Sequence, residues 1–135
     1  MRHGTTWGKR DATTRFQGFV SAEDFLQEAC ELTTDPRFES MEFFVADFID
    51  ITGHAIDMPT VREDLAAQAL GGLATNARYK IVVVADDEGI KAFTEKMRAI
   101  YAGGGPDIFL FKTRAGATQW MAGQTSTPNF RDSRL

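Results

Sequence analysis

Residues 43–65 of the chain read FFVADFIDITGHAIDMPTVREDL and pass from one kind of secondary structure to another. Residues 41–48, MEFFVADF, are apolar at both alternating positions, which is typical of a strand covered on both faces of a sheet. Thr60 and Glu63 then form a T-x-x-E capping box after Pro59, and an apolar stripe follows at helical spacing. The stretch therefore predicts a buried strand, an acidic loop and a helix that begins at Thr60 or Val61, with Thr60 as its N-cap.

The same alternation of strand and helix patterns continues in both directions from this stretch. Buried strands are predicted at residues 79–86, YKIVVVAD, and 107–112, DIFLFK. Residues 14–20, TRFQGFV, predict an edge strand, with which residues 2–8 can pair as an N-terminal β-hairpin. Ser21, with Asp24 three residues on, forms an approximate capping box for a helix that runs to about Thr34, and further helices are predicted over residues 90–101 and 113–123. This order indicates an α/β fold with an open, mostly parallel sheet.

Apolar positions on these helices predict which side chains enter the core. Leu70 lies on the stripe of the helix after Thr60, and Ile100 on the stripe of the helix over residues 90–101. Cys30 falls on the stripe of the first helix and is expected to be a small core residue. It is the only cysteine, so an internal disulfide is excluded.

Composition limits the classes of function. The chain has 135 residues, enough for one domain, which we place at residues 1–124, followed by a polar C-terminal tail at 125–135. A net charge of −4 repels phosphate backbones, so nucleic acid is not an expected partner. No apolar run approaches the ~20 residues of a membrane span, and the N-terminus lacks the pattern of a signal peptide. A cytoplasmic protein is expected.

Acidic side chains follow the predicted strands, where ligands of such sheets bind. The candidate binding loops contain Asp47, Asp50, His54, Asp57, Asp86, Asp87 and Lys112. Aspartates at these positions commonly cap helices, and this interpretation is favoured, so no catalytic residue, metal or cofactor is expected. The alternative is a metal-assisted hydrolase that uses Asp47, Asp50 and Asp86, because carboxylate oxygens bind hard divalent ions.

Three segments together resemble a known family. They are GFVSAEDFLQEACELTTDPRFESMEFFVADFIDIT (18–52), ARYKIVVVADDEGIKAFTEKMRAIY (77–101) and PDIFLFKTRAGATQWM (106–121). They resemble the SpoIIAA-like proteins of bacteria, small relatives of the STAS domain of anti-sigma-factor antagonists and sulphate-transporter tails. The similarity covers about residues 14–122. It implies an open α/β fold and a non-catalytic regulatory module that binds a protein partner.

The resemblance also implies a site for regulation. Antagonists with a phosphorylation switch carry a serine or threonine next to an aspartate at the start of the corresponding helix, and the phosphate adds about −1.5 to −2 charges there. This chain has Asp57 and Thr60, separated by Met58 and Pro59, and no Asp-Ser pair. Two interpretations of Thr60 therefore stay open: an N-cap or a phospho-acceptor.

Two further hypotheses concern apolar surface. The fold also resembles lipid-transfer domains of the CRAL-TRIO type, which implies a carrier of an apolar ligand as the alternative function. Its cavity would be lined by Phe43, Phe44, Phe48, Met97, Phe109 and Phe111, although these side chains can equally fill an ordinary core. A homodimer is also expected, because an edge strand and Gly71 with Gly72 allow close approach of a second copy.

Overall fold

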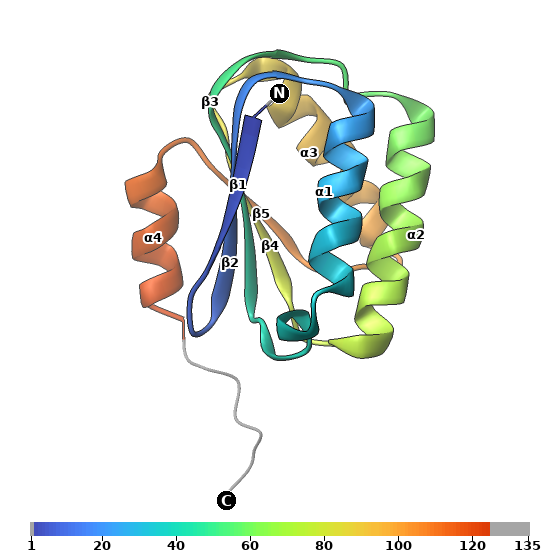
Figure 1. The fold of residues 1–135 in the computed structure, drawn as a ribbon, viewed down its shortest axis with the longest axis vertical. Helices are drawn as coiled ribbons and strands as arrows, with labels where there is room; N and C mark the ends of the chain where they lie inside the picture. Colours follow the sequence, from blue (N-terminus) through green and yellow to red (C-terminus); the bar gives the residue numbers. More distant parts are fainter. Residues whose placement is uncertain (1, 125–135) are drawn as a thin grey trace, which may run out of the picture.

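A computed structural model describes residues 2–124, which form a five-stranded sheet with helices on both faces (Figure 1). The strands are β1 (Arg2–Trp7), β2 (Asp11–Val20), β3 (Phe43–His54), β4 (Lys80–Val84) and β5 (Ile108–Phe111). The helices are α1 (Ala22–Thr34), the 3-10 helix η1 (Pro36–Ser40), α2 (Pro59–Thr75), α3 (Glu88–Tyr101) and α4 (Arg114–Ala122). The predicted tail at 125–135 lies outside the described residues.

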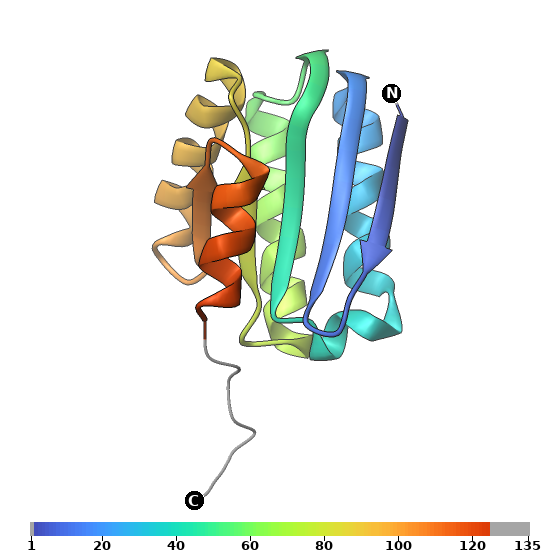
Figure 2. The ribbon, with the colours of Figure 1, turned by 90° about the vertical axis from the view of Figure 1, so that its left-hand side faces the viewer.

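The strands lie side by side in the order of the chain, β1-β2-β3-β4-β5. Only β1 is antiparallel to its neighbour, and the other pairs are parallel. Helices α1, α2 and α3 cover one face, whereas α4 lies on the opposite face over β4 and β5 (Figure 2). The predicted α/β class with a mostly parallel sheet is confirmed. No helix among residues 2–124 is long and apolar enough to span a membrane.

The N-terminal hairpin is confirmed, but β2 is not an edge strand. Thr5 pairs with Thr14, and the turn is closed by the amide of Gly8, which donates to the carbonyl of Asp11 at 2.8 Å. On its other side β2 pairs with β3 along its whole length, from Asp11 to Val20. The prediction was wrong because the short pattern of residues 14–20 does not reveal that both sides of the strand have partners.

Strand β3 is longer than the sequence predicted. It continues to His54, so Asp47, Asp50 and His54 lie within the strand and not in a loop after it. The ten residues of β2 supply a parallel partner over this length, with pairs that extend to Val20 and His54. Two irregularities in the pairing adjust the register on the way. The acidic residues are therefore held by the sheet.

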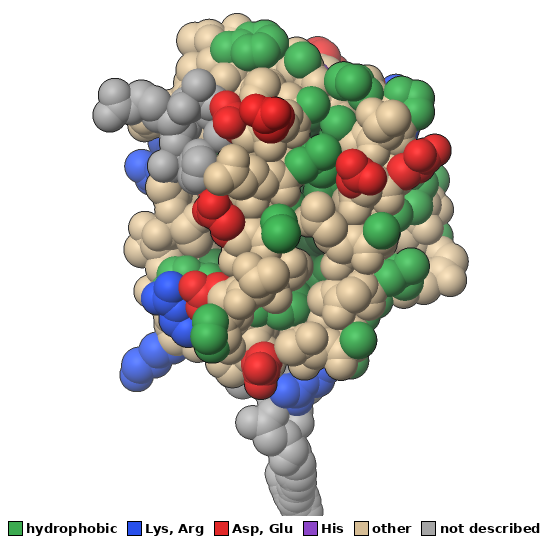
Figure 3. Space-filling model, turned by 45° about the vertical axis from the view of Figure 1, so that its right-hand side comes forward, with side chains coloured by type: hydrophobic (Ala, Val, Ile, Leu, Met, Phe, Trp, Pro, Cys, Tyr) green, Lys and Arg blue, Asp and Glu red, His purple; other side chains and the backbone are tan. Residues whose placement is uncertain are grey.

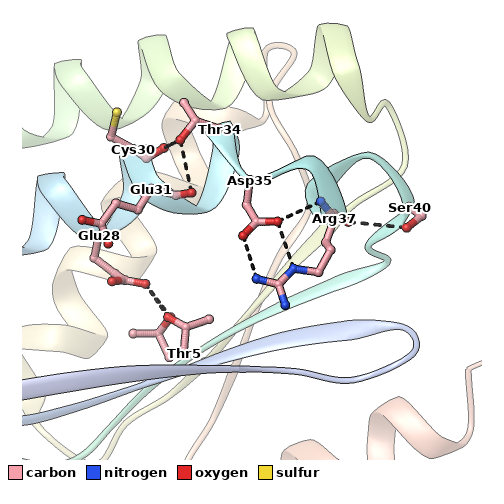
Figure 4. Close-up of polar contacts among 9 residues, drawn as sticks. Thr5, Glu28, Cys30, Glu31, Thr34, Asp35, Arg37 and Ser40 are labelled. Atoms are coloured by element: carbon pink, nitrogen blue, oxygen red, sulfur yellow. Dashed lines mark hydrogen bonds and ion pairs between the residues drawn. The ribbon is translucent and has the colours of Figure 1, made fainter.

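Helix α1 is capped as predicted but turns a different side chain inward. Ser21 accepts a hydrogen bond from the amide of Asp24 at 3.2 Å. Glu28 is only 3 % exposed, and its Oε1 accepts from the hydroxyls of Thr5 at 2.6 Å and Thr14 at 2.9 Å. Cys30, two residues further on, is exposed and points away from the sheet (Figure 4). The prediction of a core cysteine was wrong because threonine hydroxyls make burial of a glutamate favourable here.

Helix α2 begins two residues earlier than an N-cap at Thr60 would allow. Pro59 is its first residue, Met58 is the N-cap, and no side chain caps the helix. Thr60 is therefore not an N-cap, and the prediction was wrong because proline, which has no amide hydrogen to satisfy, takes the first helical position. Leu70 and Ile100 were also expected in the core, but they are 60 % and 45 % exposed.

Three apolar clusters hold these layers together. The largest lies between the sheet and α1, α2 and α3, where the rings of Phe16 and Phe48 stack at 4.7 Å. A second lies beneath η1, around the fully buried Phe38. The third lies on the opposite face, where Trp120 of α4 packs edge-on against Phe43 at 5.7 Å.

The end of α2 is fixed by a buried amide. Asn76 is 5 % exposed, and its Nδ2 donates to the carbonyls of Phe38 at 2.7 Å and Met41 at 2.6 Å. Gly72 packs one turn earlier, where a methyl group would stand 3.0 Å from Cζ of Phe38 and 3.4 Å from the Tyr79 hydroxyl. The close packing at Gly72 is thus a contact within the chain, whereas the sequence predicted close approach of a second copy at this position. At Gly71 there is open space within 4 Å.

Candidate functional site

The acidic residues of the strand ends separate into two groups. On the face that α4 covers, the Nε of Arg114 donates to Asp47 at 2.6 Å, and a terminal nitrogen of Arg114 donates to Asp50 at 2.8 Å. These hydrogen bonds raise the pKa of Arg114, the one to Asp47 having the larger effect. Arg114 is the first residue of α4, so the two aspartates attach this helix to β3.

Asp47 is almost completely buried and is satisfied on all sides. Besides Arg114, its carboxylate accepts from the amide of Ile49 at 3.0 Å and lies 3.5 Å from Nε of Arg15. The side chain of Asp86, in contrast, is 77 % exposed and lies 3.9 Å from the Lys91 ammonium. Within residues 2–124 no three His, Cys, Asp or Glu side chains are grouped so that they could hold a metal ion. The convergence of Asp47, Asp50 and Asp86 that a metal-assisted hydrolase requires is absent from this part of the chain.

The second group lies where β3 ends and α3 begins. The ring of His54 accepts a hydrogen bond at Nδ1 from the amide of Ile56 at 3.4 Å, and its Nε2 faces Oδ1 of Asp87 at 3.4 Å. Asp87 is also the N-cap of α3 and accepts from the amide of Ile90 at 2.9 Å. A methyl group at Gly89 would stand 2.5 Å from Nε2 of His54, so a larger residue here would have to displace the histidine ring. Nε2 of His54 thus links the end of β3 to the start of α3, whereas Nδ1 holds the loop that follows β3.

Asp57 connects the start of α2 to α3. Its carboxylate forms an ion pair with Arg62 and accepts from Nζ of Lys96 at 2.7 Å. The hydrogen bond from Lys96 makes the largest contribution to lowering the pKa of Asp57, and Arg62 adds to it. The loop before α2 is therefore fixed to two helices by one carboxylate.

The residues that follow Asp57 project into solvent. Met58 is 41 % exposed, and Pro59 and Thr60 are exposed as well. Thr60 is the second residue of α2, so its hydroxyl stands at a helix N-terminus that no side chain caps. We call Asp57, Met58, Thr60, Arg62 and Lys96 the rim surface. Lys112, the remaining predicted binding residue, is exposed just after β5.

Comparison with known proteins bears on the fold. No protein-family model matches the chain, and no curated protein matches it. Among solved structures, the anti-sigma factor antagonist SpoIIAA in its unphosphorylated form matches 91 % of this chain and 100 % of its own, with a TM-score of 0.55 and 11 % sequence identity.

The chain has the SpoIIAA-like fold. The predicted resemblance is thus confirmed for the architecture, and an identity this low shows the fold alone. An uncharacterized protein of the DUF3478 family from Shewanella loihica PV-4, described as having a SpoIIAA-like fold, also matches. It covers 88 % of this chain and 91 % of its own, with a TM-score of 0.49 and 16 % identity.

Beneath the helices of this SpoIIAA-like fold lies an apolar cavity of about 80 Å³. Phe44, Phe48 and Met97 line it, as the carrier hypothesis expected. The other three predicted lining residues, Phe43, Phe109 and Phe111, instead surround Trp120 on the opposite face. The prediction was wrong for them because residues at alternating positions of a strand point to opposite faces of the sheet.

Sequence reasoning missed two polar contacts that shape this region. Glu28 was not singled out, although its carboxylate accepts hydrogen bonds from Thr5 of β1 and Thr14 of β2. Asn76 was not singled out, although it holds two buried carbonyls. The available signal was positional: Glu28 lies three residues after Phe25 and four before Leu32, on the buried side of α1.

Proposed function

We propose that this protein is a non-catalytic regulatory module that binds a partner protein through the rim surface. The observation that carries the proposal is the uncapped start of α2, where Met58 and Thr60 are exposed beside a loop that Asp57 fixes to Arg62 and Lys96. An exposed apolar side chain on a rigid loop, bordered by charged groups, has the composition of a small protein-docking surface. The carboxylates near it serve as caps or ion-pair partners, which supports a binding role over a catalytic one.

We propose Thr60 as the phospho-acceptor that regulates this docking. The similar solved structure is described as an unphosphorylated form, so phosphorylation is a property of that protein. In this chain the Thr60 hydroxyl is exposed and is not used as a cap. A phosphate at the second residue of a helix is favoured by the helix dipole, so α2 would tolerate it. The added charge of about −2 would lie on the rim surface and alter docking.

Pull-down from the native host with three baits tests this proposal. The wild-type chain should capture a partner, and Thr60→Glu should lose it. Thr75→Glu is the matched control, because Thr75 is an exposed threonine at the other end of the same helix, and it should retain the partner. Capture of the same partner by the Thr60→Glu protein at wild-type yield would contradict the proposal.

We further propose that residues 1–124 act as one domain in the bacterial cytoplasm and that the chain forms a homodimer. Among residues 2–124 the outer edge of β1 has no strand partner, and this supports self-association because an unpaired edge strand can pair with a second copy. Gly71 also leaves this part of the α2 surface open to a second copy, whereas the Phe38 ring fills the space beside Gly72. Sedimentation over a range of concentrations should give a dimeric mass. A monomer at every concentration would contradict the dimer without affecting the docking proposal.

A further inference from the structure

The cavity beneath α1, α2 and α3 has the properties of a binding site for a small molecule. It lies between these helices and the inner face of the sheet, with Phe16, Phe48 and Met97 among its walls. The face formed by α1 and α2 is hollowed between the helices, and hydrophobic side chains are visible at the bottom of the hollow (Figure 3). A molecule could therefore enter between the two helices without unfolding of the sheet.

Most polar groups at the cavity wall already have partners. The Thr94 hydroxyl donates to the carbonyl of Ile90 at 2.8 Å, and Glu28 accepts from the two threonine hydroxyls of the hairpin. Burial raises the pKa of Tyr79 to about 12, so its hydroxyl stays neutral at physiological pH. The exception is Gln68 of α2, whose Oε1 is buried and has no hydrogen-bond partner among the described residues.

A bound water does not account well for an unsatisfied acceptor in an apolar cavity. A buried water is held by two to four polar partners, and apolar cavities without such partners stay dry. The cavity wall is almost wholly apolar and offers one unsatisfied acceptor, the Oε1 of Gln68. An acceptor buried without a donor is unfavourable, so a bound group that donates to it would be stabilised.

We propose that this cavity binds a small, mainly apolar molecule that carries one hydrogen-bond donor, with the donor directed to Oε1 of Gln68. The size of the cavity sets the class of ligand. An engineered cavity of about 150 Å³ accommodates benzene, and the present one, at about 80 Å³, is roughly half as large. A short aliphatic alcohol fits this description, whereas the acyl chain of a lipid does not. The cavity is separate from the proposed docking function, because no residue of the rim surface lines it.

Titration of the full chain with ethanol and with its isomer dimethyl ether, each with half as many heavy atoms as benzene, tests the proposal. The two molecules have the same atoms, but only the alcohol donates a hydrogen bond. Methyl resonances of Met97 and Val83, which line the cavity, should shift and saturate with both molecules. Ethanol should bind about two- to ten-fold more tightly than dimethyl ether, the range expected for one net hydrogen bond. In a series of longer alcohols, affinity should rise about four-fold for each added methylene until the cavity is full.

Two variants separate the cavity from other binding. Gln68→Leu should bind both isomers equally, because it removes the acceptor and keeps an apolar side chain of similar length. Ala46→Val adds two methyl groups at a position on the cavity wall and should weaken both isomers at least about four-fold. Absence of saturable shifts in the wild type, or binding that Ala46→Val leaves unchanged, would overturn the proposal. Equal affinities of the two isomers for the wild type would overturn the role of Gln68.

Discussion

Two adjacent glycines of α2 should respond in opposite ways to the same substitution. Gly71 is exposed, and a methyl group added there meets nothing within 4 Å. Gly72 is buried, and a methyl group there would stand 3.0 Å from Cζ and 3.4 Å from Cε2 of Phe38. Gly71→Ala and Gly72→Ala make the same chemical change at neighbouring positions of α2. A comparison of the two therefore tests how closely α2 packs against η1.

The magnitudes follow from helix propensity and from contact. Alanine in a helix interior is favoured over glycine by about 0.8–1.0 kcal/mol, a gain that both variants share. Gly71→Ala should keep this gain in full. At Gly72 the Phe38 ring must move by a few tenths of an ångström, but Phe38 is fully buried, Tyr79 packs edge-on against it at 4.9 Å, and Asn76 holds its carbonyl. Overpacking of this kind costs about 1–3 kcal/mol, so Gly72→Ala should be destabilised by up to about 2 kcal/mol.

Urea denaturation followed by circular dichroism measures both effects. We expect the midpoint to rise for Gly71→Ala and to fall for Gly72→Ala, with an unchanged slope, because the fold is the same. The corresponding difference in Tm between the two variants is of the order of 4–12 °C for a domain of this size. Equal stabilisation of both variants would show that Phe38 yields freely and that the contact with η1 is not close-packed. Destabilisation by Gly71→Ala would refute the open space at that position.

Three further substitutions test other contacts. Asn76→Leu leaves two buried carbonyls without their donor, and the free energy of unfolding in urea should fall by about 2–3 kcal/mol; a loss below about 0.5 kcal/mol would argue against these bonds. Arg114→Met leaves the buried Asp47 with the longer contact to Arg15, and the free energy of unfolding should fall by about 1–2 kcal/mol. This is less than for a fully buried ion pair, because Arg114 is 37 % exposed. The lowered pKa of Asp57 stabilises the fold at pH above its ordinary value of 3.8, and this contribution is lost as the pH falls through the lower value in the folded state. Acid titration of Asp57→Asn should therefore show lower stability than the wild type at neutral pH and a smaller loss on acidification, whereas parallel curves would contradict the role of Lys96.

The strand and helix order could be predicted because each buried strand is a continuous apolar run. Residues 79–86 and 107–112 contain β4 and β5, and the Ser21 cap and the end of the first helix at Thr34 were also correct. These features depend on local chemistry, namely side-chain capping and the periodicity of burial. Local chemistry is what a single sequence reports.

The errors arose where distant segments decide the outcome. Strand β3 extends to His54 because β2 pairs with it, and nothing in residues 49–54 announces that partner. Cys30 is exposed because the hydroxyls of β1 and β2 draw Glu28 inward, 23 and 14 residues away in the chain. Thr60 failed as a cap for a local reason, since Pro59 displaced it from the position that its spacing with Glu63 suggested. The division of the aspartates into two groups could not be predicted, because it depends on how the strands are aligned in the folded sheet.

The bond between Arg114 and β3 joins residues that are 67 and 64 positions apart. A ribosome releases Asp47 long before it releases Arg114, so a nascent chain that has already paired β1, β2 and β3 carries a carboxylate whose closest cation has not yet been made. Until α4 emerges, that group must stay hydrated, and the Phe43 side of the sheet must stay open to water. Closure of this face thus waits until α4 has been synthesised, and a chain stalled before residue 114 would expose it to other proteins.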